Sequence, residues 1–271
     1  MNLVDAMSSD FAAAKRWAML SLLVGSAVYF ASVIAIFLPP GADKTLAAVG
    51  FLAQVFTIFA RMRTDEFYNC GETVRRAAML QDGYGIQPSM LVIADLCARV
   101  CLPASAKPAY LGSYYASQIT VGPRRIAEIL LESAFWTKNL AAKTANIMWS
   151  AVALGTTIIV FIGISFLLWG SHVTRMEEIA RALLVSLGFW TVGDWTVLAI
   201  KYQTLARSTE PVLSNTEKLL GPSNMSSDEA LIQLGEYNAA LACGPVIPQF
   251  VYRINQSRLN LAWNAAYPKL K

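Results

Sequence analysis

This sequence has almost no histidine and a low share of charged residues. His172 is the only histidine among 271 residues, and charged residues make up 15% of the chain. With one histidine, neither a histidine-based catalytic triad nor a Cys/His zinc site is expected. The sequence also has no Walker A, GxSxG or HExxH pattern, and no dinucleotide-binding GxGxxG followed by a suitable acid. We therefore expect a protein that is not an enzyme, with no catalytic residue, no metal and no cofactor.

The cysteines and the charge balance do not favour a metal ion or a nucleic acid as a partner. Cys70, Cys97, Cys101 and Cys243 form no CxxC pair, so we expect reduced thiols packed among helices. The net charge is +4, and the chain has no Lys/Arg-rich tract. Nucleic-acid binding is therefore not expected.

The scarcity of charge accompanies an excess of apolar residues. Soluble domains carry about 25% charged residues, whereas here apolar residues form 55% of the chain and gather in runs at 17–38, 45–60, 147–169 and 182–200. A helix that rises about 1.5 Å per residue needs about 20 residues to cross a hydrocarbon core of about 30 Å. We expect an all-α membrane protein with four transmembrane helices in two hairpins and long cytosolic helical extensions.

The first hairpin needs two further arguments. The run 17–38 is too long for the apolar core of a typical signal peptide, and no A-x-A cleavage site follows it. The run 45–60 is short for a span, but it follows the tight turn at 39–41. We therefore expect it to return across the bilayer and to continue as a helix beyond it.

Basic residues predict the orientation. The connections 39–44 and 170–181 hold only Lys44, Arg175 and Arg181, and the other 19 basic residues lie in the remaining polar segments. Because cytosolic flanks of membrane helices are rich in Lys and Arg, we expect a multi-pass protein of the inner (plasma) membrane with both termini in the cytosol.

These boundaries divide the chain into four parts. Residues 1–60 form an N-terminal segment and the first hairpin, 61–146 a cytosolic helical region, 147–200 the second hairpin, and 201–271 a cytosolic helical tail. We expect 81–85 to break the second helix, and one continuous helix to run from Pro123 through the third span. Further expected helices cover 90–102, the stretch from the fourth span to about Thr209 before Pro211, 227–243 and 249–266.

Polar residues in the spans are the pore or gating candidates. Asp194 and Gln54 lie within apolar runs, where polar groups usually face a bundle interior or water. Asp194 is also close in sequence to Lys201, so a place near the cytosolic interface stays open, as does ordinary hydrogen bonding between helices.

Two arginine pairs are the candidates for binding a ligand or lipid phosphate. They are Arg75-Arg76 and Arg124-Arg125. The alternative is a solvated helix face, on which Arg124 and Arg125 pair with Glu128 and Glu132.

Several stretches resemble the SMODS-associated four-transmembrane family, the pore-forming effectors related to SLATT proteins. The resemblance covers most of the chain and includes two widely separated apolar hairpins. The stretches are Tyr114-Tyr115-Ala116-Ser117, Gly122-Pro123-Arg124-Arg125-Ile126-Ala127-Glu128, Leu131-Glu132-Ser133-Ala134-Phe135-Trp136-Thr137, Glu236-Tyr237-Asn238, Pro245-Val246-Ile247-Pro248 and Leu259 to Trp263.

This resemblance implies a homo-oligomeric, membrane-disrupting effector of bacterial antiphage defence. Such proteins are encoded beside nucleotidyltransferases that make cyclic oligonucleotide signals, so a cyclic oligonucleotide or a cytosolic activating partner is implied. The family offers no catalytic residues to carry over, and it assigns no role to Arg75, Arg76 or Asp82. Two other functions stay open: a membrane-anchored sensor or scaffold that binds a cytosolic partner, and a small transporter.

Overall fold

The computed structural model is helical throughout the part of the chain that it describes. It describes residues 3–35, 42–89, 115–169, 181–186, 189, 194–221, 225–242 and 244–268. Their named helices are α1 (Leu3–Ala35), α2 (Ala42–Tyr84), α4 (Pro123–Trp169), α6 (Asp194–Leu220), α7 (Ser227–Ala242) and α8 (Gln249–Ala266). The expected all-α class is confirmed.

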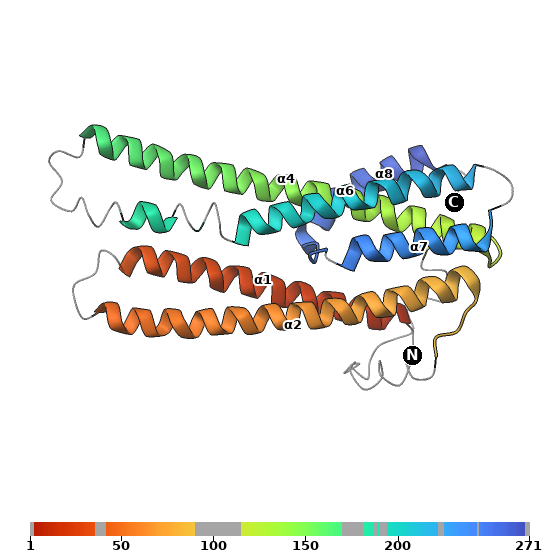
Figure 1. Cartoon of the computed structure of the whole chain (residues 1–271), viewed down its shortest axis with the longest axis horizontal. Helices are drawn as coiled ribbons and strands as arrows, with labels where there is room; N and C mark the ends of the chain where they lie inside the picture. Colours follow the sequence, from red (N-terminus) through yellow and green to blue (C-terminus); the bar gives the residue numbers. More distant parts are fainter. Residues whose placement is uncertain are drawn as a thin grey trace.

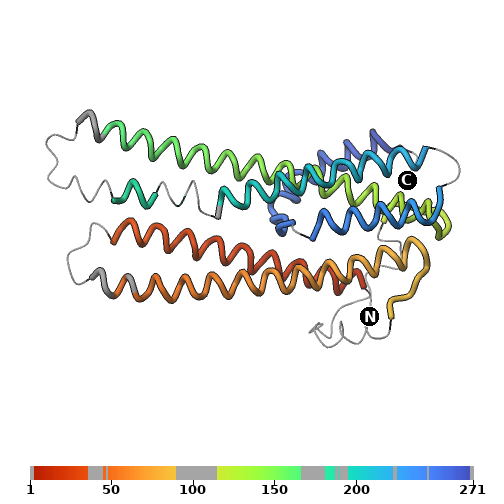
Figure 2. The backbone as a smooth tube through the Cα atoms, in the orientation of Figure 1, coloured from red at the N-terminus to blue at the C-terminus, as the bar shows by residue number. Residues whose placement is uncertain are grey.

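The long helices form two hairpins that lie side by side. α1 and α2 run antiparallel and pack along their length, and α4 packs in the same way against α6 (Figure 1). The two short helices, α7 and α8, cover one end of the second hairpin, so that this end is thicker than the other (Figure 2). The start of α1 and the end of α8 lie at this thick end.

The molecule therefore has two halves, which we name by their surfaces. The apolar half comprises the described residues of 17–35, 45–60, 147–169 and 181–200, which share the thin end in Figure 1. The polar half comprises the remaining described residues. α2 and α4 run through both halves without a break.

The main core lies in the polar half. Ile126, Ile129 and Leu130 of α4 are fully buried, and they cluster with Leu205 and Val212 of α6. A second cluster joins the first turns of α1 to α2. Helical spacing of apolar residues after Pro123 predicts this buried stripe on α4, and the stripe packs against α2, α6 and α7.

In the apolar half, by contrast, many large apolar side chains are on the outside. Large apolar side chains point outward from it, among them Phe51 with 69% and Phe161 with 70% of its surface exposed. Within the described residues, two helices, Leu3–Ala35 and Pro123–Ser165, are long and apolar enough to cross a membrane. The expected run 45–60 is helical as part of α2, whereas 187–188 and 190–193 of the run 182–200 lie outside the described residues.

The prediction that the helix after the fourth span ends near Thr209 was wrong. α6 continues through Pro211 to Leu220. Proline removes one helical hydrogen bond, and its ring crowds the carbonyl four residues earlier. The helix persists because Thr209, Val212 and Thr216 are buried on both sides of Pro211, and this packing offsets the local cost.

Other helix boundaries agree with the sequence. α4 runs unbroken from Pro123, α8 has the expected limits, and α7 begins at Ser227. α2 ends within 81–85, where Gly85 adopts φ +72°, a left-handed conformation that favours glycine. The expected helix 90–102, His172, Cys97, Cys101, Cys243 and most of both short connections lie outside the described residues.

Candidate functional site

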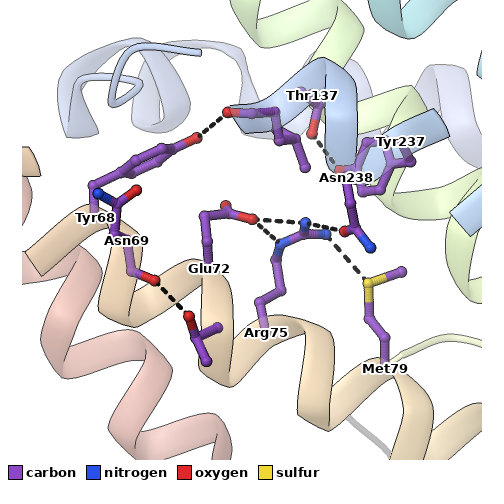
Figure 3. Close-up of polar contacts among 10 residues, drawn as sticks. Tyr68, Asn69, Glu72, Arg75, Met79, Thr137, Tyr237 and Asn238 are labelled. Atoms are coloured by element: carbon purple, nitrogen blue, oxygen red, sulfur yellow. Dashed lines mark hydrogen bonds and ion pairs between the residues drawn. The ribbon is translucent and has the colours of Figure 1, made fainter. Parts of the chain in front are cut away.

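A buried arginine joins the two hairpins within the polar half. Arg75 lies on α2, and its guanidinium donates to Glu72 Oε2 at 2.7 and 2.8 Å and to Asn238 Oδ1 on α7 at 3.3 Å (Figure 3). It also lies 4.8 Å from the centre of the Tyr237 ring. A positive charge over an aromatic face is attractive when both are shielded from water. Arg75 therefore binds α7 through the Asn238 amide and the Tyr237 ring, while Glu72 of its own helix pairs with its charge.

The surroundings keep Arg75 charged despite its burial. Burial by itself would lower the pKa of the guanidinium, but Tyr237 and the Glu72 carboxylate more than compensate, so its pKa lies above its ordinary value. The Arg75–Glu72 pair lies within α2, and a buried ion pair of this kind is weak evidence for stability. Because Arg75 already has an acidic partner, it is poorly placed to receive a phosphate.

A second layer of polar contacts extends the junction to α4. The Tyr237 hydroxyl lies 2.8 Å from Thr137 Oγ1 on α4. The Tyr68 hydroxyl of α2 donates to the Leu241 carbonyl at 3.5 Å, and burial raises the pKa of Tyr68. These contacts connect α2, α4 and α7, so that a shift of one hairpin against the other would have to break several of them (Figure 3).

The other arginine of interest, Arg125, holds the end of α2 against the start of α4. It pairs with Asp82 at 2.7 Å and donates to the Ile119 carbonyl at 2.5 Å. Next to it, the Gly122 amide donates to the Gly83 carbonyl at 2.7 Å. Arg125 therefore links the two hairpins through an ion pair. It does not lie on a solvated helix face.

The expected pairing on the exposed face of α4 is only partly correct. Arg124 approaches Glu128 at 3.6 Å, but Glu128 is buried and accepts a hydrogen bond from Ser117 at 2.7 Å. Glu132 accepts the Ala116 amide at 2.9 Å, and burial raises its pKa. These acids hold the segment before α4, a role that helical spacing alone does not reveal.

The structure therefore separates the four candidate arginines. Arg75 and Arg125 have carboxylate partners inside junctions, Arg76 is half-buried on α2, and Arg124 keeps 60% of its side chain exposed. Arg124 is thus the most accessible of them. The four are not gathered into one anion site.

The pore candidates differ in position. Gln54 is exposed on α2 in the apolar half, among Phe51, Leu52 and Val55, which are also exposed. Asp194 is the first residue of α6, and its side chain lies outside the described part of the structure. Gln54 is therefore a polar group on an apolar outer surface.

A link between the hairpins in the apolar half was not predicted. The ring of Tyr29 on α1 stacks on Phe189 at 4.1 Å, and its hydroxyl donates to Ser186 at 2.7 Å. In the sequence, these residues are unremarkable members of two apolar runs. Only the folded arrangement brings them together.

Neither a metal centre nor a known relative points to a specific chemistry. Among the described residues, no group of three or more His, Cys, Asp and Glu side chains could hold a metal ion. Comparisons with protein-family models, curated proteins and solved structures gave no match to this chain.

Proposed function

We propose that this protein is an oligomeric, membrane-perforating effector whose apolar half lies in a lipid bilayer and whose polar half lies in the cytosol. One observation carries the proposal: large apolar side chains cover the outside of the apolar half. Exposed apolar patches beyond a few hundred square ångströms are rare in soluble monomers and mark contact with lipid or protein. Lipid accounts for a surface that runs along both hairpins.

Hairpin geometry supports four crossings. α1 and α4 are each long and apolar enough to span. The run 45–60 packs antiparallel to α1, so it occupies the same depth as its partner. The described residues of 181–200 lie beside the end of α4 in the same way (Figure 1).

The distribution of charge supports the orientation. Lys15, Arg61, Lys143 and Lys201 lie where the polar half begins, next to the apolar half. Basic residues collect on the cytosolic side of membrane proteins. The chain therefore enters and leaves the bilayer on the cytosolic side.

Gln54 supports assembly of several copies. An amide on a lipid-facing surface is costly unless it finds a hydrogen-bond partner, and polar side chains do bond between membrane helices. Gln54 of neighbouring copies would satisfy each other or line a shared conduit. A bundle of four helices is too narrow to conduct by itself. A pore would therefore form between the copies that Gln54 brings together.

The family resemblance supplies the biological setting of the proposal: membrane damage triggered by a cyclic oligonucleotide or a cytosolic partner during phage infection. A signal opens the assembly only if it binds the open arrangement better than the closed one. Among the four arginines considered, Arg124 is the best placed to meet such a signal. The junction around Arg75 would transmit a movement of the polar half into both hairpins.

The experiment is controlled expression in bacteria with a membrane-potential dye. Depolarisation and growth arrest are expected, and Gln54→Leu should reduce both while the protein stays in the membrane fraction. Gln203→Leu, a substitution of the same kind in the polar half, is the control. Unchanged potential at high membrane abundance, with or without a co-expressed nucleotidyltransferase, would overturn the pore.

A membrane-anchored scaffold is the second candidate, because α8 presents apolar side chains outside the apolar half. Phe250, Ile254 and Leu261 are exposed there, and positions four and eleven residues apart fall on one helix face. Such a stripe suits a cytosolic partner. Loss of function from Ile254→Lys without any depolarisation by the parent protein would favour the scaffold.

A further inference from the structure

A cleft lies between the two hairpins where the apolar half meets the polar half. Its volume is about 1530 Å³, larger than the roughly 300–1,000 Å³ of a usual small-molecule pocket. One wall comes from α1 and α2. The other comes from α6, one residue of α4, and the chain from the end of α7 into the first turns of α8.

The cleft is lined by more basic than acidic side chains. Lys15, Arg16, Arg61, Lys201 and Arg253 line it, opposed by two acids, Asp5 and Asp65. Lys15, Arg16, Lys201 and Arg253 have no carboxylate partner within the residues described, although Lys15 donates to the neutral Gln249 Oε1 at 2.7 Å and Arg16 to the Ala12 carbonyl at 3.3 Å. Burial lowers the pKa of Lys15, and no described anion offsets this effect.

Apolar side chains of the apolar half line the cleft as well. Met19 and Leu22 of α1 face the cleft together with Met148 of α4 and Val197 and Leu198 of α6. These side chains lie inside the predicted spans, whereas Lys15 and Lys201 lie just outside them. At the boundary between the halves, basic side chains of the cleft thus lie next to apolar side chains of the predicted spans, and the cleft continues into the polar half past Phe11 and Val246.

We infer that this cleft binds an acidic phospholipid, with its phosphate among Lys15, Arg16, Lys201 and Arg253 and an acyl chain along Met19, Leu22 and Val197. The inference rests on the proposed membrane location. Basic pockets between membrane helices on the cytosolic side suit anionic headgroups. A soluble phosphate compound would use the basic side chains alone, whereas a phospholipid would also use the apolar side chains.

The position of the cleft gives the lipid a mechanical role. Hairpin contacts lie on both sides of it: Tyr29 with Phe189 toward the apolar end, and Arg75 with Asn238 in the polar half. A lipid wedged between them favours the separation of hairpins that fits it. Its release or exchange would therefore change how the hairpins pack without breaking the Arg75 junction.

Binding to the purified protein in a neutral detergent tests this inference. Phosphatidylglycerol should bind, and phosphatidylcholine with the same acyl chains should bind weakly, as measured by native mass spectrometry and by the shift in melting temperature. Lys15→Gln with Lys201→Gln should weaken phosphatidylglycerol binding about 25-fold, at about fivefold per side chain. Arg207→Gln, which removes an exposed charge from α6 outside the cleft, should change little.

Further measurements keep the inference open to refutation. Lys15→Arg should keep the phosphatidylglycerol binding that Lys15→Gln loses. The lipid-free melting temperature of each variant shows whether it still folds. Equal binding of both lipids, or unchanged binding by the double variant, would overturn the lipid site. Stabilisation by inorganic pyrophosphate that is as strong as that by phosphatidylglycerol would assign the site to soluble phosphates instead. Vesicle leakage is measured separately, so failure of the proposed pore is distinguishable from failure of the lipid site.

Discussion

The two halves of the molecule use the same helices but place their apolar side chains in opposite ways. In the polar half, Ile126 and Leu130 of α4 are fully buried. In the apolar half, Leu154 and Phe161 of that same helix are largely exposed. Because α4 has no break between them, the difference does not come from the helix itself. It reflects what surrounds each part of the helix. This contrast is the main argument for a bilayer around one half and water around the other.

The halves also differ in how their hairpins meet. In the polar half, the hydrogen bond from Arg75 to Asn238, the Arg125–Asp82 ion pair and the close approach of Gly83 to Ile126 hold the hairpins together. In the apolar half, a described contact between hairpins is Tyr29 with Ser186 and Phe189. Directional polar contacts favour one arrangement of the hairpins, whereas apolar contacts can rearrange with less loss. We therefore expect the polar half to determine how the two hairpins are arranged. The apolar half should change its packing when that arrangement changes.

The largest effect is expected at the buried junction. Arg75→Met leaves Glu72 buried without its partner and should cost about 3–5 kcal/mol of stability. Arg63→Met is the matched control, because Arg63 pairs with Glu66 at the same three-residue spacing on the exposed part of α2 and should cost at most about 1 kcal/mol. Thermal melting in detergent measures both. Equal losses would mean that burial does not distinguish the two pairs.

A charge placed on the apolar surface should have the next largest effect. Phe161→Lys should disfavour insertion by about 2.5–3.5 kcal/mol near mid-membrane, and carbonate extraction should release part of the protein. Leu261→Lys is the control, since Leu261 is 71% exposed but lies in the polar half. Tight membrane association of both variants would break the comparison between the halves.

Glycine substitutions sharpen the contrast in packing. A Cβ at Gly83 would lie 2.6 Å from Ile126 Cδ1 and 3.1 Å from its Cα. Gly83→Ala should therefore cost about 1–3 kcal/mol through overpacking. Gly50→Ala in the apolar half meets no atom within 4 Å and should be neutral or stabilise α2 by up to about 1 kcal/mol. Melting temperatures that shift in the same direction would contradict this difference.

The smallest effect concerns a buried acid near the start of α1. Asp10 is buried, and one carboxylate oxygen has no hydrogen-bond partner within the part of the chain described here. Burial raises the pKa of Asp10 above its ordinary value of 3.8. Since the folded state then holds the proton more tightly than the unfolded state, stability falls as the pH rises from 3.8 through the raised pKa.

Asp10→Asn should remove that loss. At pH 7, it should stabilise the protein by about 1 kcal/mol and flatten the dependence of the melting temperature on acidic pH. Asp65→Asn, at an exposed position of α2, serves as the control. A lower melting temperature for Asp10→Asn at pH 7 would show that the charged form has a partner in solution.

Much of the helical framework could be predicted from the sequence. Apolar runs and helical spacing located α2, α4 and α8, and Pro123 and Gly85 fall at helix ends as their backbone preferences require. Pro211 misled the prediction, because tertiary packing outweighed the local cost of proline. Arg125 is similar: spacing on α4 suggested Glu128 and Glu132 as partners, but its partner is Asp82, 43 positions away.

By itself, the sequence determined where most of the helices form and where long apolar runs lie within them, since these properties depend on residues close together along the chain. Only the tertiary structure decided which charges are buried together, where Gln54 faces, and that basic residues from α1, α2, α6 and α8 line one cleft. Contacts between residues far apart in sequence depend on how the hairpins pack. No local pattern encodes that packing.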